Sequence, residues 1–429
     1  MKILFIACYS PLINNSAAIE TLQYLNKLSE INNNEVHLLT VNFPKDSIYY
    51  DEVLRSMMND KIKTHIIDGG LIFKKFMPRN SESYNNSPSK IGNPNRRKVL
   101  RKIKNALAIP DMYYSWARKA GRYGIKLMEK EKFDVIFSMH EPPSSHLCAY
   151  YIKKHYPKVP WITYWSDPWL KDSTREKSFI VKKVLEKNME RDIVNLADKF
   201  IFVTDANRDE YLKDYNILDN SRTFILNRGF DAKLYDKLLH EETPKLIKKD
   251  KLNIIYTGEI FSKLRDIGPF VKALEEIKTE NLEIYNQLNV LFFGNIDDIE
   301  ARKKLQNLEI ANVSPRIPFD EALKYMLNGE VLLLFGNKNS KQIPAKIYDY
   351  FGAKGRIFVI YGDKDDPIKR VVENHRKCVV TENNSKEIKN HIYKLIEIHK
   401  NNEIYCEPDV NYEWNSIVER LNNILEGSE

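Results

Sequence analysis

The hydrophobic pattern of this 429-residue chain alternates short apolar runs with segments of helical spacing. The run KILFIA at Lys2–Ala7 is typical of a buried strand, and apolar positions three residues apart follow from Ile19 to Leu28. EVHLLTV at Glu35–Val41 then returns to a strand pattern. Strand, helix and strand in succession predict a parallel sheet of the α/β class from the first residues onward.

The same alternation continues through the rest of the chain. Further strands of the first half are predicted within Thr64–Asp68, Phe133–Met139, Pro160–Trp165, Ala197–Thr204 and Arg222–Asp231. Those of the second half are predicted within Leu252–Ile260, Leu288–Gly294, Val313–Ile317, Val331–Phe335, Ile357–Ile360 and Lys377–Thr381. A polar segment with a proline, residues 231–250, separates the halves, so we expect two tandem Rossmann-like doubly wound domains facing a cleft.

These patterns give explicit domain boundaries. We expect an N-terminal domain at 1–235, with a mobile Ser-, Asn- and Pro-rich insert at about 78–97, and a C-terminal domain at 236–410. Residues 411–429 are predicted to form a helix with Ile417, Leu421 and Ile424 on one face. That apolar face is expected to pack back on the N-terminal domain.

Composition limits the class of protein. With 43% hydrophobic and 29% charged residues and no long apolar run, the chain is expected to be a soluble globular protein. Its four cysteines are far apart, which predicts reduced thiols and hence a cytoplasmic protein. Its histidines show no metal-ligand spacing, so no metal site is predicted.

Part of the net charge of +8 is concentrated in Arg96–Lys104, where six of nine residues are basic. Such a run forms a solvated helix face, a nucleic-acid contact or a contact with an anionic membrane surface. No nucleic-acid-binding motif accompanies it, so nucleic acid is the weakest of these alternatives.

Two loops of the first half carry candidate catalytic residues. The loop HEPPSSH places His140 and His146 after a predicted strand, where a histidine can bind a hydroxyl or transfer a proton. Asp167 in the segment SDPW follows the next strand. For each there is an alternative: His146 as an ordinary helix N-terminal residue, Glu141 as the acid or base of the loop, and Trp169 as core or as a platform for a sugar.

The second half carries a candidate anion site. Gly258 permits a tight exit from a strand, and Lys263 and Arg265 precede a predicted helix. Asp349 lies in the first turns of a short helix that follows the strand Val331–Phe335, where a carboxylate can accept hydrogen bonds from a ribose diol. On spacing alone, Lys263 and Arg265 are equally compatible with surface charges, and Asp349 with an acid favoured by the helix dipole.

Taken in order, four segments resemble the bacterial glycosyltransferases of the two-domain GT-B fold, near glycosyltransferase family 4. They are FDVIFSMHEPPSSHL, PWITYWSDPW, LNIIYTGEIFSKLRDIGPFVKAL and VLLLFGNKNSKQIPAKIYDYFGAKGRIFVI. The resemblance implies an acceptor in the N-terminal domain and a nucleotide-sugar, UDP- or GDP-linked, in the C-terminal domain. It also implies retention of anomeric configuration and no cofactor or bound metal.

The resemblance also assigns donor-site residues. Asp349 matches the position of the glutamate that binds the ribose, and Lys263 and Arg265 match a basic pair at the diphosphate. Arg316 and Ile317 lie in a loop, SPRIP, that matches the one flanking the base, and Gln342 and Lys346 lie in the loop and helix before Asp349.

Two departures from the family pattern affect the details. Asn15 and Ser16 stand in a first loop where many relatives have paired glycines, and Lys341 stands where a first glutamate is usual. The contact to the donor sugar must then come from elsewhere, such as the backbone N–H groups of residues 339–342.

The function that these features predict is a hexosyltransferase-type enzyme of bacterial surface polysaccharide synthesis. It would act in the cytoplasm, peripherally at the inner membrane face through Arg96–Lys104, on a lipid-linked or glycan acceptor. Two alternatives stay open: a non-catalytic nucleotide- or sugar-binding subunit, and a sugar-nucleotide epimerase.

Overall fold

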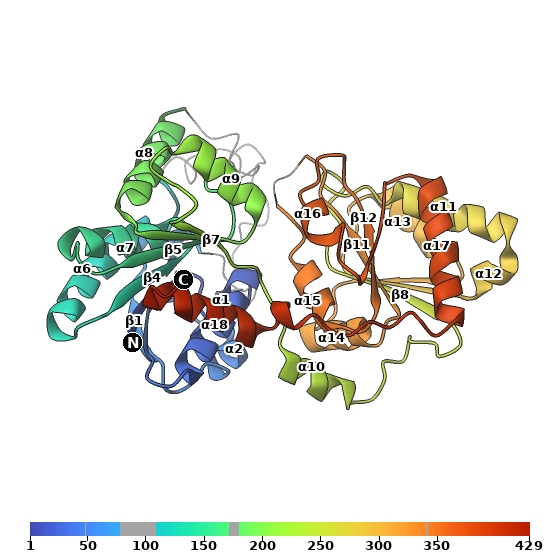
Figure 1. Cartoon of the computed structure of the whole chain (residues 1–429), viewed down its shortest axis with the longest axis horizontal. Coiled ribbons are helices and arrows are strands. Elements are labelled where there is room, and N and C mark those ends of the chain that lie inside the picture. The colour runs from blue at the N-terminus through green and yellow to red at the C-terminus, as the bar shows by residue number, and fades with distance from the viewer. Residues whose placement is uncertain (48, 78–108, 171–179, 340–341) are drawn as a thin grey trace, which may run out of the picture. The chain divides into compact units, whose positions relative to one another are not determined.

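The computed structural model describes residues 1–47, 49–77, 109–170, 180–339 and 342–429 (Figure 1). The chain forms two compact units: an N-terminal unit of Met1–Asn227 with Ile417–Glu429, and a C-terminal unit of Arg228–Ser416. The unit boundaries thus lie at 228 and 417, where the sequence pattern places them at 236 and 411. The predicted insert at 78–97, the basic run Arg96–Lys104 and Lys341 lie outside the described residues.

The N-terminal unit is built on a parallel sheet in the order β3-β2-β1-β4-β5-β6-β7. Val36 and Val135 pair with Ile3 from either side, so β1 is central and the direction of winding reverses between β1 and β4. The strands are β1 (Lys2–Ile6), β2 (Glu35–Val41), β3 (Lys63–Ile67), β4 (Val135–Met139), β5 (Trp161–Trp165), β6 (Lys199–Phe202) and β7 (Thr223–Ile225).

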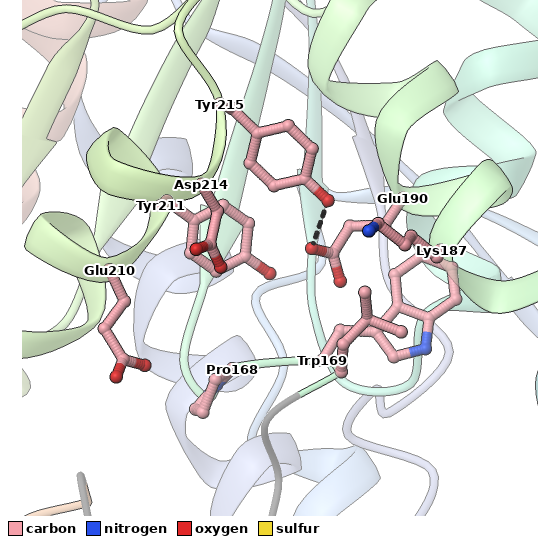
Figure 2. A pocket seen from close by; sticks show the side chains of 9 residues that line it. Pro168, Trp169, Lys187, Glu190, Glu210, Tyr211, Asp214 and Tyr215 are labelled. Carbon is pink, nitrogen blue, oxygen red and sulfur yellow. Dashed lines mark hydrogen bonds between the residues drawn. The ribbon is translucent and has the colours of Figure 1, made fainter. Parts of the chain in front are cut away.

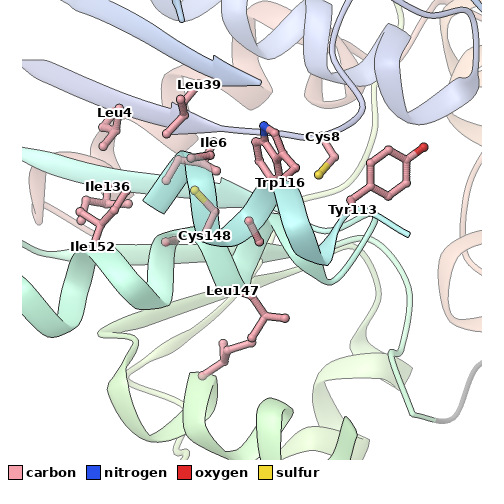
Figure 3. Close-up of a cluster of buried hydrophobic side chains, with 14 of the residues drawn as sticks. Leu4, Ile6, Cys8, Leu39, Tyr113, Trp116, Ile136, Leu147, Cys148 and Ile152 are labelled. Atoms are coloured by element: carbon pink, nitrogen blue, oxygen red, sulfur yellow. The ribbon is translucent and has the colours of Figure 1, made fainter. Parts of the chain in front are cut away.

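Helices bury the apolar faces of this sheet. One core cluster joins strand residues such as Leu4 and Ile136 to Trp116 of α6 and Ile152 of α7 (Figure 3). These central strands are apolar on both faces, as expected for a parallel sheet covered by helices. The helices are α1 (Ser16–Glu30), α2 (Glu52–Ser56), α3 (Gly70–Phe76), α6 (Tyr114–Lys130), α7 (Ser144–His155), α8 (Ile180–Leu196) and α9 (Asp205–Asp214), and most of α18 (Trp414–Glu426) belongs to this unit.

The C-terminal unit repeats the plan with a parallel sheet in the order β10-β9-β8-β11-β12-β13. Its strands are β8 (Leu252–Thr257), β9 (Leu288–Phe293), β10 (Ala311–Ser314), β11 (Val331–Phe335), β12 (Arg356–Ile360) and β13 (Cys378–Thr381). Its helices are α10 (Ala232–Leu239), α11 (Gly268–Glu280), α12 (Leu282–Asn286), α13 (Ile299–Gln306), α14 (Phe319–Leu327), α15 (Lys346–Gly352), α16 (Lys369–Val372) and α17 (Ser385–Lys400), with a 3₁₀ turn η1 (Val410–Tyr412). Both orders are the doubly wound, Rossmann-like arrangement, which confirms the predicted fold class.

The N-terminus of α1 is explained by its local sequence. The side chain of Asn15 accepts a hydrogen bond from the Ala18 amide at 2.8 Å and so caps the start of the helix.

The expectation of a strand over Val313–Ile317 is wrong, since β10 ends at Ser314. Pro315 comes next, and its missing N–H and fixed φ end a ladder at the edge of a sheet.

Within the described residues, no helix has both the length and the apolar character needed to cross a membrane. The four cysteines are free thiols, with Cys8 and Cys148 buried in the N-terminal core.

Candidate functional site

The C-terminal unit gathers polar side chains at its switch point, where β8 and β11 lie side by side and the winding direction reverses. The loops that leave these two strands contain Gly258 and Asn337, and α15 follows β11. In open α/β sheets the crevice at the carboxyl ends of such strands is the usual ligand site. The fold therefore puts Arg265, Lys346 and Asp349 at the edge where a ligand is expected.

Lys346, in the first turn of α15, is held over the end of β8. Its ammonium donates a hydrogen bond to the carbonyl of Thr257 and lies 4.0 Å from the centre of the Tyr256 ring. Burial, with repulsion from Arg265 as the second cause, lowers the pKa of Lys346 to about 7. The side chain therefore exchanges its proton readily near neutral pH, and a neighbouring anion would favour the charged form.

Arg265 is fixed beside it by three hydrogen-bond acceptors. Its Nε donates to Oδ1 of Asn337 at 3.0 Å, and its Nη1 donates to the carbonyl of Glu259 at 2.9 Å and to the Tyr256 hydroxyl at 3.4 Å. Asn337 is in turn anchored, because its amide donates to the carbonyl of Gln342 at 2.8 Å. The guanidinium is therefore pre-positioned across the ends of two strands, which suits recognition of a phosphate group.

Asp349 is a half-buried acid one turn after Lys346. The hydroxyl of Tyr235, from α10, donates to its carboxylate at 3.4 Å. Burial raises the pKa of Asp349 to about 6, against the opposing effects of Tyr235, Arg228 and Lys346. A carboxyl with this pKa is largely ionised at neutral pH and can accept hydrogen bonds from two neighbouring hydroxyls.

Two glycines keep the backbone close to this cluster. Gly258 has φ +123°, and a Cβ there would lie 2.5 Å from the Nζ atom of Lys346. Gly294, directly after β9, has φ +140°, and a Cβ there would lie 2.2 Å from the carbonyl oxygen of Gly258. Only glycine takes such φ values without strain, so both residues are required by the geometry of the Lys346 site.

Three of the predicted donor residues lie apart from this cluster. Lys263 and Arg316 are exposed, and Ile317 is half-buried in the loop after β10. In the described part of the chain, no hydrogen bond or ion pair joins Lys263 or Arg316 to Lys346, Arg265 or Asp349. Their contacts with a donor stay predictions, as does the role of Gln342, whose carbonyl fixes Asn337.

In the N-terminal unit, the ends of β4 and β5 bring His140 and Asp167 into neighbouring loops. The His140 amide donates to the carbonyl of Tyr164 at 2.8 Å, and the Ser166 hydroxyl donates to the carbonyl of His140 at 3.0 Å. The His140 ring stacks on Trp165 with centroids 5.5 Å apart. His140 is 5% exposed and Asp167 is half-buried, and both residues follow the carboxyl ends of their strands.

His146 lies deeper. It is fully buried in α7, with Nδ1 2.8 Å from the Ser138 hydroxyl and its ring 4.4 Å from Trp165. Burial lowers the pKa of His146 to about 3, so the imidazole is neutral at physiological pH. Because the Trp161 indole N–H donates to the same hydroxyl at 2.8 Å, Ser138 can donate its own hydrogen bond to Nδ1. The His146 ring stacks on the His140 ring with centroids 5.8 Å apart, so it supports the position of His140 from inside the core.

One group of possible metal ligands exists within the described residues: Glu35, His37 and Glu131. Both carboxylates are already paired with Lys2, and Glu35 also with Lys63. The group lies at the amino ends of the strands, away from the loops that carry His140 and Asp167. Its arrangement is that of an ion-pair network at the base of the sheet.

Four residues that contact Lys346, Arg265, Asp349 or Gly258 were not among those predicted from the sequence: Tyr256, Asn337, Tyr235 and Gly294. A signal existed for two of them, since Asn337 lies close after the predicted strand Val331–Phe335 and Gly294 is the last residue of the predicted segment Leu288–Gly294. Tyr256 and Tyr235 look like core residues, and they are in fact 1% and 5% exposed. Only their polar tips reach the cluster, which a one-dimensional pattern does not reveal.

Comparison with models of protein families finds no match for the chain. An uncharacterized glycosyltransferase of Methanocaldococcus jannaschii is 20% identical over 249 residues, which are 56% of this chain and 61% of that protein. The chain thus matches about three-fifths of the length of this curated relative.

Two solved structures are similar over the whole chain. The sucrose-phosphate synthase of Thermosynechococcus elongatus is 12% identical with a TM-score of 0.57, and the match covers 100% of this chain and 98% of the synthase. The UDP-GlcNAc 2-epimerase of Neisseria meningitidis, bound to UDP-GlcNAc, is 12% identical with a TM-score of 0.58, and the match covers 100% of both chains. The chain therefore has the GT-B-like fold of two Rossmann-like units.

Proposed function

We propose that this protein is a glycosyltransferase that moves a sugar from a nucleotide-sugar to a lipid-linked or polysaccharide acceptor. The observation that carries the proposal is the arrangement of Lys346 and Arg265 with Asp349 at the switch point of the C-terminal unit. Two cations and an acid at the carboxyl ends of β8 and β11 match the two ends of a nucleoside diphosphate, the phosphates and the ribose.

The chemistry assigned to these residues is charge stabilisation. As the bond from the sugar to the diphosphate breaks, negative charge grows on the leaving phosphate oxygen. Lys346, in a low-dielectric position, and Arg265, already fixed by Asn337, stabilise that charge without reorganising. Asp349 orients the ribose and hence the diphosphate. On this basis the transfer needs no bound metal and, by the family resemblance, retains the anomeric configuration.

The acceptor is assigned to the N-terminal unit, near His140 and Asp167. These side chains would position a hydroxyl of the acceptor. His140 follows β4 and Asp167 follows β5, and these two strands are neighbours in one sheet. A place in bacterial surface polysaccharide synthesis, with a peripheral membrane contact through Arg96–Lys104, completes the proposal.

Thermal stabilisation by UDP, GDP, ADP and CMP tests the donor site. A rise in melting temperature with one nucleotide, reduced in Asp349→Asn, supports the proposal and names the base for turnover assays. Lys394→Ala, on α17 of the same unit, serves as the control, because it removes an exposed cation to which no donor contact is assigned. If no nucleotide stabilises the protein, or if Asp349→Asn responds as the wild type does, the donor site is wrong.

A second candidate function is a sugar-nucleotide epimerase, favoured by the similarity to the Neisseria meningitidis enzyme. Turnover separates the two, because a transferase releases the nucleoside diphosphate only with an acceptor, whereas an epimerase gives an isomeric nucleotide-sugar alone. Nucleotide binding with neither product would instead indicate a non-catalytic binding subunit.

A further inference from the structure

A second candidate site lies in the N-terminal unit, whereas Lys346, Arg265 and Asp349 belong to the C-terminal unit. It is a pocket of about 280 Å³ between the segment after β5 and the helices α8 and α9 (Figure 2). Its lining residues are Pro168, Trp169, Leu170, Lys187, Glu190, Glu210, Tyr211, Asp214 and Tyr215.

Three polar groups converge in this pocket from two helices and the segment that follows α9. The Tyr215 hydroxyl donates to Oε1 of Glu190 at 2.7 Å, and the Tyr211 hydroxyl lies next to the same carboxyl (Figure 2). Tyr211 is 5% exposed and Glu190 is 3% exposed. Among the described residues, neither the Tyr211 hydroxyl nor Oε2 of Glu190 forms a hydrogen bond of good geometry. Buried polar atoms left in this state are costly unless a ligand or water satisfies them.

The helix that supplies Glu190 has an unusual distribution of residues. The inner positions of α8 carry Glu186 and Glu190, which are 2% and 3% exposed, while Ile180 and Val181 are 81% and 70% exposed. An amphipathic helix normally places apolar residues inside. The Tyr215 hydroxyl, the Tyr211 hydroxyl and the Leu170 backbone lie against the Glu190 carboxyl. Within the described part of the chain its Oε2 atom still lacks a hydrogen bond of good geometry, so this atom has capacity left for a ligand.

We propose that this pocket binds one sugar ring of a neutral carbohydrate. Hydroxyls of a sugar both donate and accept, so they can pair with a carboxyl and a phenol together, and the half-buried Leu170 and Tyr215 add apolar lining beside the ring. Three acids, Glu190, Glu210 and Asp214, against one base, Lys187, disfavour a phosphate or carboxylate ligand.

Two further observations fit this ligand class. The volume lies just below the range of roughly 300–1,000 Å³ that is usual for larger ligands, as expected for a single ring. Burial raises the pKa of Glu190 to about 7, so near neutral pH the carboxyl is available both as a donor and as an acceptor. The inference deepens the proposed function and rests on it for one point, namely that the bound sugar belongs to the glycan on which the enzyme acts.

The test uses the full chain and four probes: the methyl α-pyranosides of glucose, galactose and mannose, and N-acetylglucosamine. Saturation-transfer NMR detects binding, and calorimetric titration gives the Kd. At least one probe should bind saturably, and Tyr211→Phe and Glu190→Gln should each weaken it about three- to tenfold, the value of one hydrogen bond. Tyr123→Phe, the same change on α6 outside the pocket, should leave the Kd unchanged.

The UDP, GDP, ADP and CMP panel, repeated on each pocket variant, keeps this test separate from the nucleotide site. A preserved nucleotide response with weakened sugar binding supports the pocket, and it also shows that the variant is folded. If Glu190→Gln does not fold, Tyr211→Phe, which removes one atom, decides alone. The inference is overturned if no probe binds, if both variants bind as the wild type does, or if choline or glucose 1-phosphate binds in place of the neutral sugars.

Discussion

The ammonium of Lys346 lies 4.0 Å from the centre of the Tyr256 ring, and it donates to the carbonyl of the next residue, Thr257. The contact joins the start of α15 to the end of β8, and Lys346 and Thr257 are 89 residues apart in the sequence. It fixes a cation at the switch point of the sheet. The response of the protein to pH and to substitution should reflect this arrangement and the buried histidine of the N-terminal unit.

Nucleotide affinity should depend on pH through Lys346. The pKa of its ammonium is about 7 in the free protein, and a bound diphosphate raises that pKa because it favours the charged form. Above pH 7, binding then requires uptake of a proton, so the Kd of the stabilising nucleotide should rise from pH 7 to pH 9 by up to about tenfold per pH unit. Calorimetric titration at several pH values measures this.

Lys346→Arg is the matched variant for that experiment, because a guanidinium stays charged throughout this range. Its Kd should be flat between pH 7 and pH 9. The terminal phosphate of the nucleotide titrates near pH 6, below the range of pH 7 to pH 9, so its ionisation contributes little to the change in Kd. Parallel pH profiles in the two proteins would contradict the assignment of the proton to Lys346.

Asp349→Asn should raise the stability of the C-terminal unit at neutral pH. Burial raises the folded-state pKa of Asp349 to about 6, above its unfolded value, so the folded protein binds the extra proton more tightly. The resulting stabilisation is complete below about pH 4 and is lost as the pH rises through 6. As the pH rises from 4 to 7, the free energy of unfolding of the variant should therefore increase by about 1–2 kcal/mol relative to that of the wild type.

Calorimetric melting of both proteins at pH 4, 5, 6 and 7 gives that difference. Asp250→Asn, a change at an exposed aspartate elsewhere in the C-terminal unit, is the control and should show no such trend. A stability difference that is constant with pH would mean that Asp349 is not perturbed by burial.

Gly294→Ala should destabilise the protein more than Gly258→Ala. The new Cβ at 294 meets the backbone carbonyl of Gly258, which cannot move freely, whereas the one at 258 meets the flexible end of Lys346. We expect a loss of about 2–4 kcal/mol for Gly294→Ala. Gly258→Ala should lose less stability but weaken nucleotide binding, because it displaces the Lys346 ammonium.

Gly427→Ala provides the control for backbone strain alone. Gly427 has φ +79°, and a Cβ at this residue would meet no atom within 4 Å, so only the positive φ is penalised, at about 1 kcal/mol. Melting temperatures of the three variants rank the effects. Equal losses at 294 and 427 would show that the contact with Gly258 is unimportant.

His146→Ala should act on stability. The side chain fills buried space against Trp165 and bonds Ser138, so its removal should cost about 2–4 kcal/mol. Since burial holds the pKa of His146 at about 3, this residue should contribute no titration to activity between pH 5 and pH 8. His146→Gln, which keeps a hydrogen-bonding group, should recover part of the stability.

The pH profile of turnover, measured on wild type and His146→Gln, checks the second part. Profiles of the same shape are expected, with only the amplitude reduced. A pKa between 5 and 8 that disappears in the variant would make His146 a catalytic group, as its position in the loop HEPPSSH first suggested.

The hydrophobic pattern was enough to predict the fold class, the succession of strands along the chain and most of the polar residues that follow them. Long apolar runs such as Val331–Phe335 are typical of buried strands, and polar residues directly after them lie at the carboxyl edge of a parallel sheet. Arg265 and Asp349 were predicted as candidates in this way, whereas Lys346 was predicted only through the resemblance to glycosyltransferases. The end of β10 was misplaced, because the predicted strand Val313–Ile317 extended past Pro315, which ends the ladder.

Which of these polar residues meet depends on the packing of the folded chain. Lys263 and Arg265 have the same charge and lie in the same loop, so the sequence does not distinguish them. In the described part of the fold only Arg265 is bound to this site, because its guanidinium donates to the Glu259 carbonyl after β8 and to the Asn337 side chain after β11. His140 and His146 look alike in one loop, yet the turn into α7 buries His146 completely. The pocket around Glu190 could not be predicted, since its residues come from segments whose proximity depends on how helices α8 and α9 pack on the sheet. The spacing of residues along the chain determines which segments form strands or helices and which side chains share a face. The burial and the pKa of a side chain depend on neighbours that are distant in sequence.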